Sequence, residues 1–260
     1  MATYILPLVL FLVTFYFIIS GKVNRAIASF VGALAMVILG MTLDFYSQED
    51  AFHAIDFNMI GLLVGMMVIV SVCKKTGFFS FVAIKAAKAS KGSPMRLMIM
   101  MGFVTAFLSM ALDNVTTIIL VIPITVLICD ILGISPLPII VTEIVLSNIG
   151  GVGTMVGDPP NMMIASSANL SFNDFIVHLF PIALGAAVLS LGVLAIVFRK
   201  DIKRRPIDFR PILEIDEREA IRDEKTLRKV ILSLIIVFAL FVVQKKLGFH
   251  HCFIALLGAG

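Results

Sequence analysis

A polar, glycine-rich stretch interrupts the apolar sequence at Ser147-Asn148-Ile149-Gly150-Gly151-Val152-Gly153-Thr154-Met155-Val156-Gly157-Asp158-Pro159-Pro160-Asn161. In hydrocarbon, irregular backbone is tolerated only where protein buries it or where it lines a water-filled site, because each unpaired amide is costly. The stretch therefore predicts a discontinuous membrane helix over residues 137–168, interrupted at a functional site. The alternative is a glycine-proline kink that only bends a span, but a kink requires neither Asp158 nor the two asparagines.

Two adjacent prolines close this stretch. Pro159 and Pro160 fit the first turn of a second half-helix, where their missing N–H groups cost nothing. The positive end of that half-helix would then point into the gap. Transporters build substrate and ion sites from half-helices of this kind.

The composition places the chain in a membrane. Hydrophobic residues make up 60% of the sequence and charged residues only 15%, whereas roughly a quarter of the residues of a soluble domain are charged. Cys73, Cys129 and Cys252 have neither metal nor redox spacing and are expected to serve in packing. We expect an all-α polytopic membrane protein that is not an enzyme and needs no cofactor. Its expected partner is the lipid bilayer, and we expect it to bind no nucleic acid.

The pattern of charge gives the orientation. Apolar runs predict spans at residues 4–20, 26–43, 57–73, 175–198 and 227–243. With the N-terminus outside, 19 of the 21 basic residues fall on the inner side. On that side we expect an amphipathic surface helix at residues 78–91 and a cytoplasmic loop at residues 199–229.

A second irregular point lies at Leu112-Asp113-Asn114-Val115-Thr116-Thr117, between two apolar arms. The count of charges allows residues 94–132 either to cross twice or to enter and leave by one face. So abrupt a polar turn favours a re-entrant hairpin whose tip stops near the midplane.

Three carboxylates lie at predicted membrane depth, namely those of Asp113, Glu143 and Asp158. Ionisable groups there are costly and are by default functional hypotheses, and all three are candidate proton sites. If the hairpin tip meets the helix break, the cluster offers the oxygen ligands that a sodium ion prefers. The expected ion- or substrate-binding residues are Asp113, Asn114, Thr117, Ser147, Asn148, Gly150, Gly151, Thr154, Asp158 and Asn161.

Two neighbouring carboxylates raise each other's proton affinity, so that a proton and a cation can compete for one site. Such competition is the minimal chemistry of an antiporter, with Na+ or H+ as the coupling ion and no other metal site. The alternative is a buried polar knot that only locks two irregular elements together.

The paired motifs, Phe107 to Thr117 and Ser147 to Asn161, resemble those of the ion transporter superfamily that includes citrate transporters. The branch most like this chain holds NhaD-type sodium/proton antiporters, arsenite permease-like proteins and the P protein. The resemblance implies two inverted repeats, each with a re-entrant hairpin and a broken helix. It also implies ion- or substrate-binding roles at Asp113, Asn114, Ser147, Asn148, Asp158 and Asn161.

Two departures from that pattern matter. Dicarboxylate carriers resemble it but place Ser-Asn-Thr at the tip, where this chain has Asp113-Asn114-Val115. A carboxylate repels an anion, which favours a cation/proton antiporter, or an arsenite permease, over a citrate or dicarboxylate permease. Only one hairpin and one broken helix are present, so we expect the first half of a longer transporter, dimeric when complete.

The same residues allow other functions. A channel is the second hypothesis within transport. The Gly157-Asp158 pair is reminiscent of intramembrane aspartyl proteases, but Met155 stands where their motif has its first glycine and Leu112 precedes Asp113 in place of a tyrosine. With no transit signal, we expect a prokaryotic inner membrane.

Overall fold

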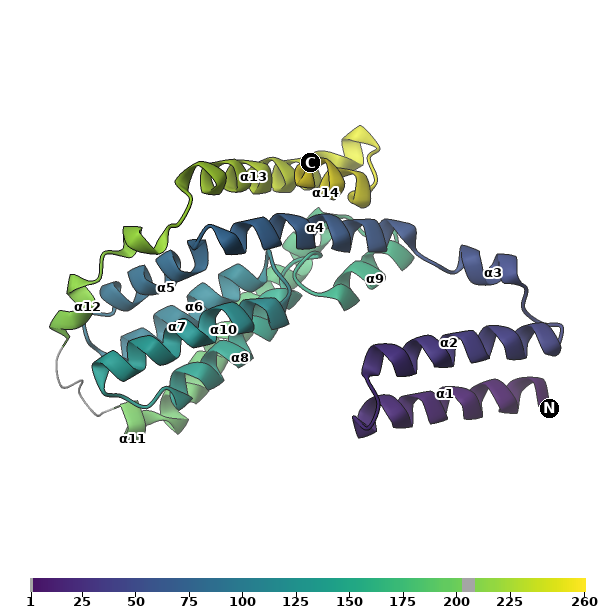
Figure 1. Cartoon of the computed structure of the whole chain (residues 1–260), viewed down its shortest axis with the longest axis horizontal. Helices are drawn as coiled ribbons and strands as arrows, with labels where there is room; N and C mark the ends of the chain where they lie inside the picture. The colour runs from purple at the N-terminus through teal and green to yellow at the C-terminus, as the bar shows by residue number, and fades with distance from the viewer. Residues whose placement is uncertain (1, 203–208) are drawn as a thin grey trace. The chain divides into compact units, whose positions relative to one another are not determined.

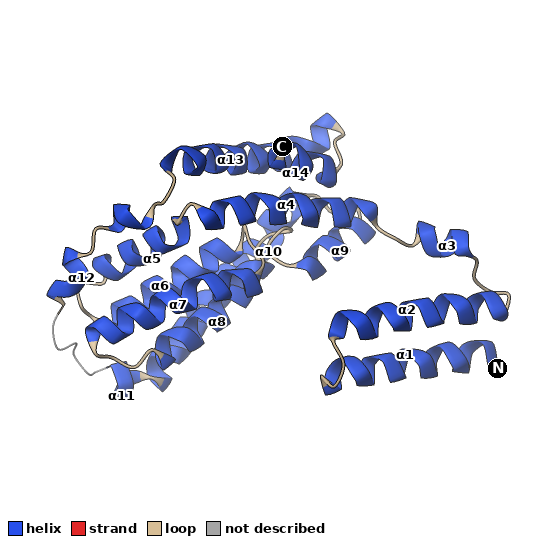
Figure 2. Ribbon diagram, in the orientation of Figure 1, coloured by secondary structure: helices blue, strands red, loops and turns tan. Residues whose placement is uncertain are grey.

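The computed structural model describes residues 2–202 and 209–260. The described residues fold into helices joined by loops, and no strand occurs among them (Figure 2). The chain separates into two compact units, residues 1–56 and 57–260. The two units are described separately.

The first unit holds three helices: α1 (Ala2–Ser20), α2 (Arg25–Thr42) and α3 (Gln48–His53). Asn24 starts α2, because its Oδ1 accepts the backbone N–H of Ala26 at 2.9 Å. Packing of α2 on α1 requires glycine at position 32, where a Cβ would lie 2.4 Å from Thr14 Cγ2. Most apolar side chains of both helices are exposed, as expected for helices that face lipid.

The second unit contains the remaining helices (Figure 1). They are α4 (Phe57–Lys75), α5 (Phe78–Ala89), α6 (Pro94–Ser109), α7 (Asn114–Leu132), α8 (Leu137–Val152), α9 (Pro159–Ser167), α10 (Phe172–Val197), α11 (Arg199–Ile202), α12 (Arg210–Glu214), the 3-10 helix η1 (Glu217–Ala220), α13 (Glu224–Leu247) and α14 (His251–Ala259).

Five stretches of the described residues are long and apolar enough to cross a membrane. They are Arg25–Thr42, Gln48–Lys75, Asn114–Leu132, Phe172–Val197 and Glu224–Leu247. The expected polytopic all-α membrane fold is confirmed. α6 and α8 are apolar but have only 16 residues each, and so belong to the shorter class.

α4 lies between the α13–α14 pair and the other helices of the second unit (Figure 1). Its glycines bring α14 very close: a Cβ at Gly65 would lie 2.6 Å from the carbonyl carbon of Ala255. At the start of α4, Asn58 Oδ1 accepts the backbone N–H of Cys252 at 3.0 Å. α14 is therefore fixed to α4 both by packing and by a hydrogen bond.

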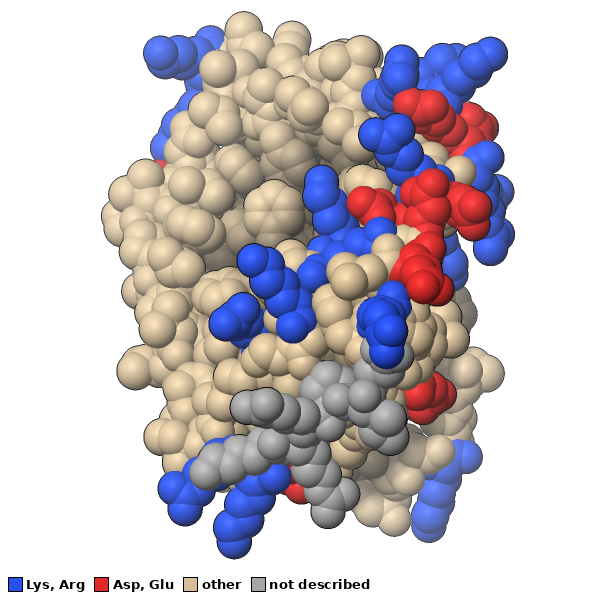
Figure 3. Space-filling model, turned by 90° about the vertical axis from the view of Figure 1, so that its left-hand side faces the viewer, with Lys and Arg blue, Asp and Glu red and all other residues tan. Residues whose placement is uncertain are grey.

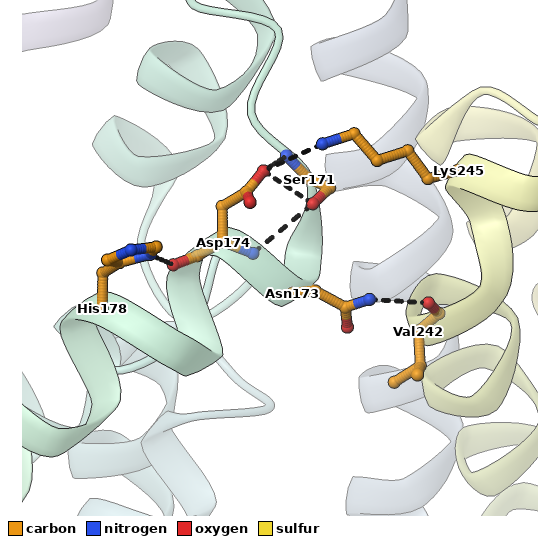
Figure 4. A network of polar contacts seen from close by, with 6 residues as sticks. All are labelled: Ser171, Asn173, Asp174, His178, Val242 and Lys245. Carbon is orange, nitrogen blue, oxygen red and sulfur yellow. Dashed lines mark hydrogen bonds and ion pairs between the residues drawn. The ribbon is translucent and has the colours of Figure 1, made fainter.

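The first turn of α10 is fixed to the end of α13 (Figure 4). Ser171 and Asp174 form a capping box, which satisfies backbone N–H groups at the start of α10. Asn173 Nδ2 donates to the carbonyl of Val242 at 2.8 Å, and Lys245 Nζ lies 3.5 Å from Asp174 Oδ2. These contacts anchor the long α10 at one end.

The structure describes most of the two segments that are expected at the inner surface. α5 is a helix, but its apolar face, including Phe79 and Ala83, is buried against the protein. The expected 199–229 loop is shorter, because α13 already begins at Glu224; residues 203–208 of it lie outside the described residues. Lys88 of α5 pairs with Glu217 of η1. Lysine, arginine and acidic residues gather on the side of the molecule that carries α5 and α12, which faces the viewer in Figure 3.

Candidate ion site at the helix break

The turn between α6 and α7 meets the interruption between α8 and α9. Thr154 Oγ1, inside the interruption, donates to the carbonyl of Met110 at 2.5 Å. Ser109 Oγ donates to the carbonyl of Ser147 at 2.6 Å. The backbone N–H of Gly157 returns to Thr154 Oγ1 at 3.0 Å. The two irregular segments are thus bonded directly to each other.

Glycine allows this meeting. A Cβ at Gly150 would lie 2.2 Å from the carbonyl oxygen of Ala106, and one at Gly157 would lie 2.7 Å from that of Ser109. One α6 turn earlier, Gly102 packs against Leu146. Gly102 thus lies near Leu146, and Ala106, one turn later, lies near Gly150, one turn later on the other helix. α6 and α8 therefore run parallel, and they end at the same level.

Asn161 closes the broken end of α8. Its Nδ2 donates to the carbonyls of Gly151, Val152 and Thr154, at 3.2, 3.4 and 2.9 Å. The side chain is buried, and the carbonyls that it binds would otherwise lack partners at the helix end. In this conformation Asn161 therefore stabilises the break, and these carbonyls are already occupied.

An asparagine pair connects the hairpin to α8. Asn114 Nδ2 donates to Asn148 Oδ1 at 2.8 Å, and Asn148 Nδ2 donates to the carbonyl of Ile144 at 2.8 Å. Asn148 is exposed, unlike Ser147, which is buried and bonds through Oγ to the same carbonyl at 2.9 Å. The Asn148 side chain can therefore be reached from outside the protein.

The two aspartates sit at the starts of helices. Asp113 Oδ1 caps α7 by accepting the N–H of Thr116 at 2.8 Å, and the Asp113 carbonyl accepts from the buried Thr117 Oγ1 at 2.9 Å. Asp158 precedes α9, yet its carboxylate makes no capping bond and has no hydrogen bond among the described residues. A Cβ at Gly151 would lie 2.9 Å from Asp158 Oδ2.

Asp113 and Asp158 are half-buried and close enough to interact electrostatically. The chain thus brings one partly satisfied and one unsatisfied carboxylate to the point where two helices begin. Each helix start carries a partial positive charge, which favours an anion there. Neighbouring carboxylates repel each other, so this pair favours the binding of a cation or a proton.

A cavity of about 190 Å³ opens beside Asp113, between α4, the hairpin turn and the start of α9. Its walls are mainly apolar, but Thr116 and Lys74 also line it. Sequence reasoning did not select Lys74, because it reads as one of the inner-surface lysines that follow a span. It also missed Ser109, whose hydroxyl looks like any other in an apolar helix.

Glu143 lies apart from this cluster. Its side chain is fully buried in α8 and accepts a hydrogen bond from Thr125 Oγ1 of α7 at 2.5 Å. Of the expected site residues, the structure gathers the others around the hairpin turn and the break. Glu143 instead lies between α7 and α8.

The sequence of this chain is similar to those of known membrane proteins. A family model described as "Citrate transporter" (CitMHS) matches residues 15–260. The chain belongs to this transporter family. A 46 kDa membrane protein of Mycobacterium leprae is 41% identical over 98% of this chain, and the P protein of Mus musculus is 31% identical over 90%.

The alignment with the Mycobacterium leprae protein covers 60% of that protein, and the alignment with the P protein covers 30%. An uncharacterized transporter of Mycobacterium tuberculosis is 41% identical, again over 98% of this chain and 59% of the relative. The chain therefore spans about 60% of the length of its mycobacterial relatives. It is a membrane-embedded member of a transporter family.

Proposed function

We propose that this chain belongs to a secondary active transporter that exchanges Na+, or a similar small cation, for protons at the helix break. The observation that carries the proposal is the unsatisfied carboxylate of Asp158 beside that of Asp113. Two carboxylates close together at membrane depth need a cation or a proton to offset their repulsion. The cation and the proton therefore bind at the same site as alternatives.

The cation's ligands follow from which oxygens remain free. Asp113 Oδ1 is used by Thr116, which leaves Oδ2, and both oxygens of Asp158 are unbonded. Asn148 Oδ1 accepts one hydrogen bond from Asn114, and amide oxygens can accept more than one partner. We assign these oxygens to the cation, and the carbonyls held by Asn161 to the framework.

A re-entrant arrangement is supported by the shortness of two parallel helices: α6, the first arm of the expected hairpin, and α8, the first half of the broken helix. Each has only 16 residues, about 24 Å of helix, which is short for a membrane of about 30 Å. The cavity beside Asp113 is lined by α4 residues from Leu63, in the second turn of that helix, to Lys74, in its last turn. We place the tip near the midplane of a prokaryotic inner membrane, with the chain's N-terminus outside, and expect the complete protein to be a homodimer.

One observation favours a second function, the transport of an anion or of a neutral oxyacid. Lys74 lines the same cavity as Asp113, so a carboxylate or an arsenite-type group could bind to its ammonium. The family description points in the same direction. In this case Asp113 and Asp158 serve the coupling ion, and Lys74 serves the substrate.

The test uses the full-length gene product in proteoliposomes with an imposed pH gradient and a pH-sensitive dye. Sodium, lithium, arsenite and citrate are added in turn. We expect Na+ or Li+ to dissipate the gradient, and Asp113→Asn and Asp158→Asn each to abolish that response. Asp130→Asn, which alters an exposed aspartate at the other end of α7, is the control.

Two other outcomes are informative. A response to citrate or arsenite alone, lost in Lys74→Met, would replace the cation proposal with the second function. A flux that neither saturates nor runs uphill would indicate a channel. A wild-type response to sodium that survives both aspartate substitutions would overturn the assigned site.

A further inference from the structure

Glu143 is a titratable group that the proposed ion site does not use. None of its surface is exposed, and one carboxyl oxygen, Oε1, lies 2.5 Å from Thr125 Oγ1. The other oxygen, Oε2, is buried and has no hydrogen-bond partner among the described residues. Such a group needs an explanation, because buried polar atoms are almost always paired.

Among the described residues, the helices around Glu143 offer no counter-charge. α8 packs against α6, α7 and α10. On α7, the thiol of Cys129 is near enough to interact with Glu143, and the next residue along the chain is Asp130. The only charged residue of α6 is Arg96, in its first turn, and α10 carries Asp174 and His178 in its first two turns. No ion pair to Glu143 is found in the part of the chain that the structure describes.

A bare carboxylate in such a place loses its hydration without gaining a counter-charge, so the neutral acid is the form that this conformation accepts. The Thr125 hydroxyl suits either protonation state. It can accept the acid's O–H when Glu143 is protonated, and it can donate to the carboxylate once the proton has left.

Glu143 is also distant from the aspartates. Seven residues separate it from Gly150 at the break, which is about 10 Å along a helix axis. A proton on Glu143 therefore does not occupy the space of a cation bound by Asp113 and Asp158.

We propose that Glu143 binds a transported proton at a second site between α7 and α8, with Thr125 as its positioning residue. The role in transport rests on the proposed function; the protonated state does not. The proton leaves to water when α7 and α8 part, and the charged carboxylate then opposes their reclosure until a proton returns. Movement of the hairpin is thereby coupled to protonation.

The first test detects the bound proton without any transport. The purified full-length gene product at pH 7 is examined by infrared spectroscopy for the carbonyl stretch of a protonated carboxylic acid. We expect a band that is lost in Glu143→Gln and retained in Asp130→Asn. Persistence of the full band in Glu143→Gln, or its absence from the wild type, would overturn the proposal whatever the protein transports.

The second test measures coupling in proteoliposomes. Glu143→Gln keeps the size and the hydrogen bond to Thr125 but cannot release a proton. We expect it to retain Na+/Na+ exchange and to lose at least ~90% of the sodium-driven proton flux. Asp113→Asn should lose both activities. Undiminished proton flux in Glu143→Gln would reject Glu143, whereas a wild type that ignores all cations would reject only the proposed function.

Substitutions at Thr125 test whether this residue positions the proton or only supports the structure. Thr125→Val removes the donor that supports the carboxylate, so proton release becomes harder. The pH dependence of the proton flux should then move upward by roughly one pH unit. Thr125→Ser retains the hydroxyl and should restore the original profile. An unchanged profile in Thr125→Val would show that Thr125 does not position this proton.

Discussion

Asn114 of the hairpin and Asn148 of α8 are joined side chain to side chain at 2.8 Å, although 34 residues separate them in the sequence. This bond connects the start of α7 to the last turns of α8, where the two proposed carboxylate ligands meet. It also holds in place Asn148 Oδ1, which we propose as a cation ligand. A change here affects both the geometry of the site and its oxygen supply.

Asn148→Ala should weaken apparent Na+ affinity about tenfold, because it removes a ligand oxygen and one hydrogen bond worth about 1 kcal/mol. The KM for sodium in proteoliposomes measures this effect. Asn173→Ala is the control, since it removes a bond of the same 2.8 Å length at the remote α10–α13 contact. Equal changes in KM for the two variants would rule out a ligand role for Asn148.

Gly150→Ala should destabilise the second unit by roughly 1–3 kcal/mol, since the added methyl must displace α6 from α8. At its Cβ position the carbonyl oxygen of Ala106 is 2.2 Å away. Thermal unfolding in detergent should show a midpoint several degrees lower. Gly192→Ala, in α10, has nothing within 4 Å of its added Cβ and should leave the midpoint unchanged or slightly raised. If the two variants melt alike, the close approach of α6 to α8 is wrong.

Asn161→Ala should open the helix break, because three carbonyls lose their donor and each unsatisfied group costs about 1–3 kcal/mol. Hydrogen exchange measures the consequence locally: the amide of Gly157, bonded to Thr154 Oγ1, should exchange faster. Amides in the middle of α10 should keep their protection. Unaltered exchange at Gly157 would mean that Asn161 does not maintain the break.

The Lys88–Glu217 pair should make the α5–η1 contact sensitive to acid. Its hydrogen bond with Lys88 lowers the pKa of Glu217 below the ordinary value. The pair therefore contributes stability above the ordinary glutamate pKa, and this contribution disappears as pH falls through the lowered value. Glu217 is partly exposed to solvent at this contact, so the effect is modest and weakens with salt.

Hydrogen exchange of the Arg222 amide measures that contact, because this amide donates to the carbonyl of Thr76 at 2.9 Å. Its protection should fall on acidification in the wild type and should be lower and flatter with pH in Lys88→Met. Glu219→Gln, which alters an exposed carboxylate of the same 3-10 turn, is the matched control. A pH response that persists in Lys88→Met would assign it to another group.

Local sequence was sufficient to predict where the broken helix stops and restarts. Glycine density around Gly150 to Gly157 ends α8 at Val152, and Pro159 and Pro160 occupy the first turn of α9. Asp113 precedes α7 as an N-cap residue, a role typical of aspartate at a helix start. These features depend on a few neighbouring residues, which is why they can be read directly.

The use of each polar group could not be read in the same way. Asn161 and Thr154 were expected to bind an ion, yet their side chains bond to carbonyls of the break and of the hairpin turn. That outcome depends on α6 running parallel to α8, a tertiary relationship with no local signature. Lys74 enters the cavity of Asp113 for the same reason, through the position of α4.

The contact of α4 with α14 has a mechanical consequence for Asp113. Met66 of α4 lines the cavity, and the adjacent Gly65 lies against the backbone of Ala255 on the other face of the helix. A helix wall supported by another backbone at this distance yields very little by itself, because there is no flexible side chain between them to compress. When α4 moves away from the cavity, α14 must therefore move with it. α14 does not line the cavity, yet through α4 it restricts access to Asp113.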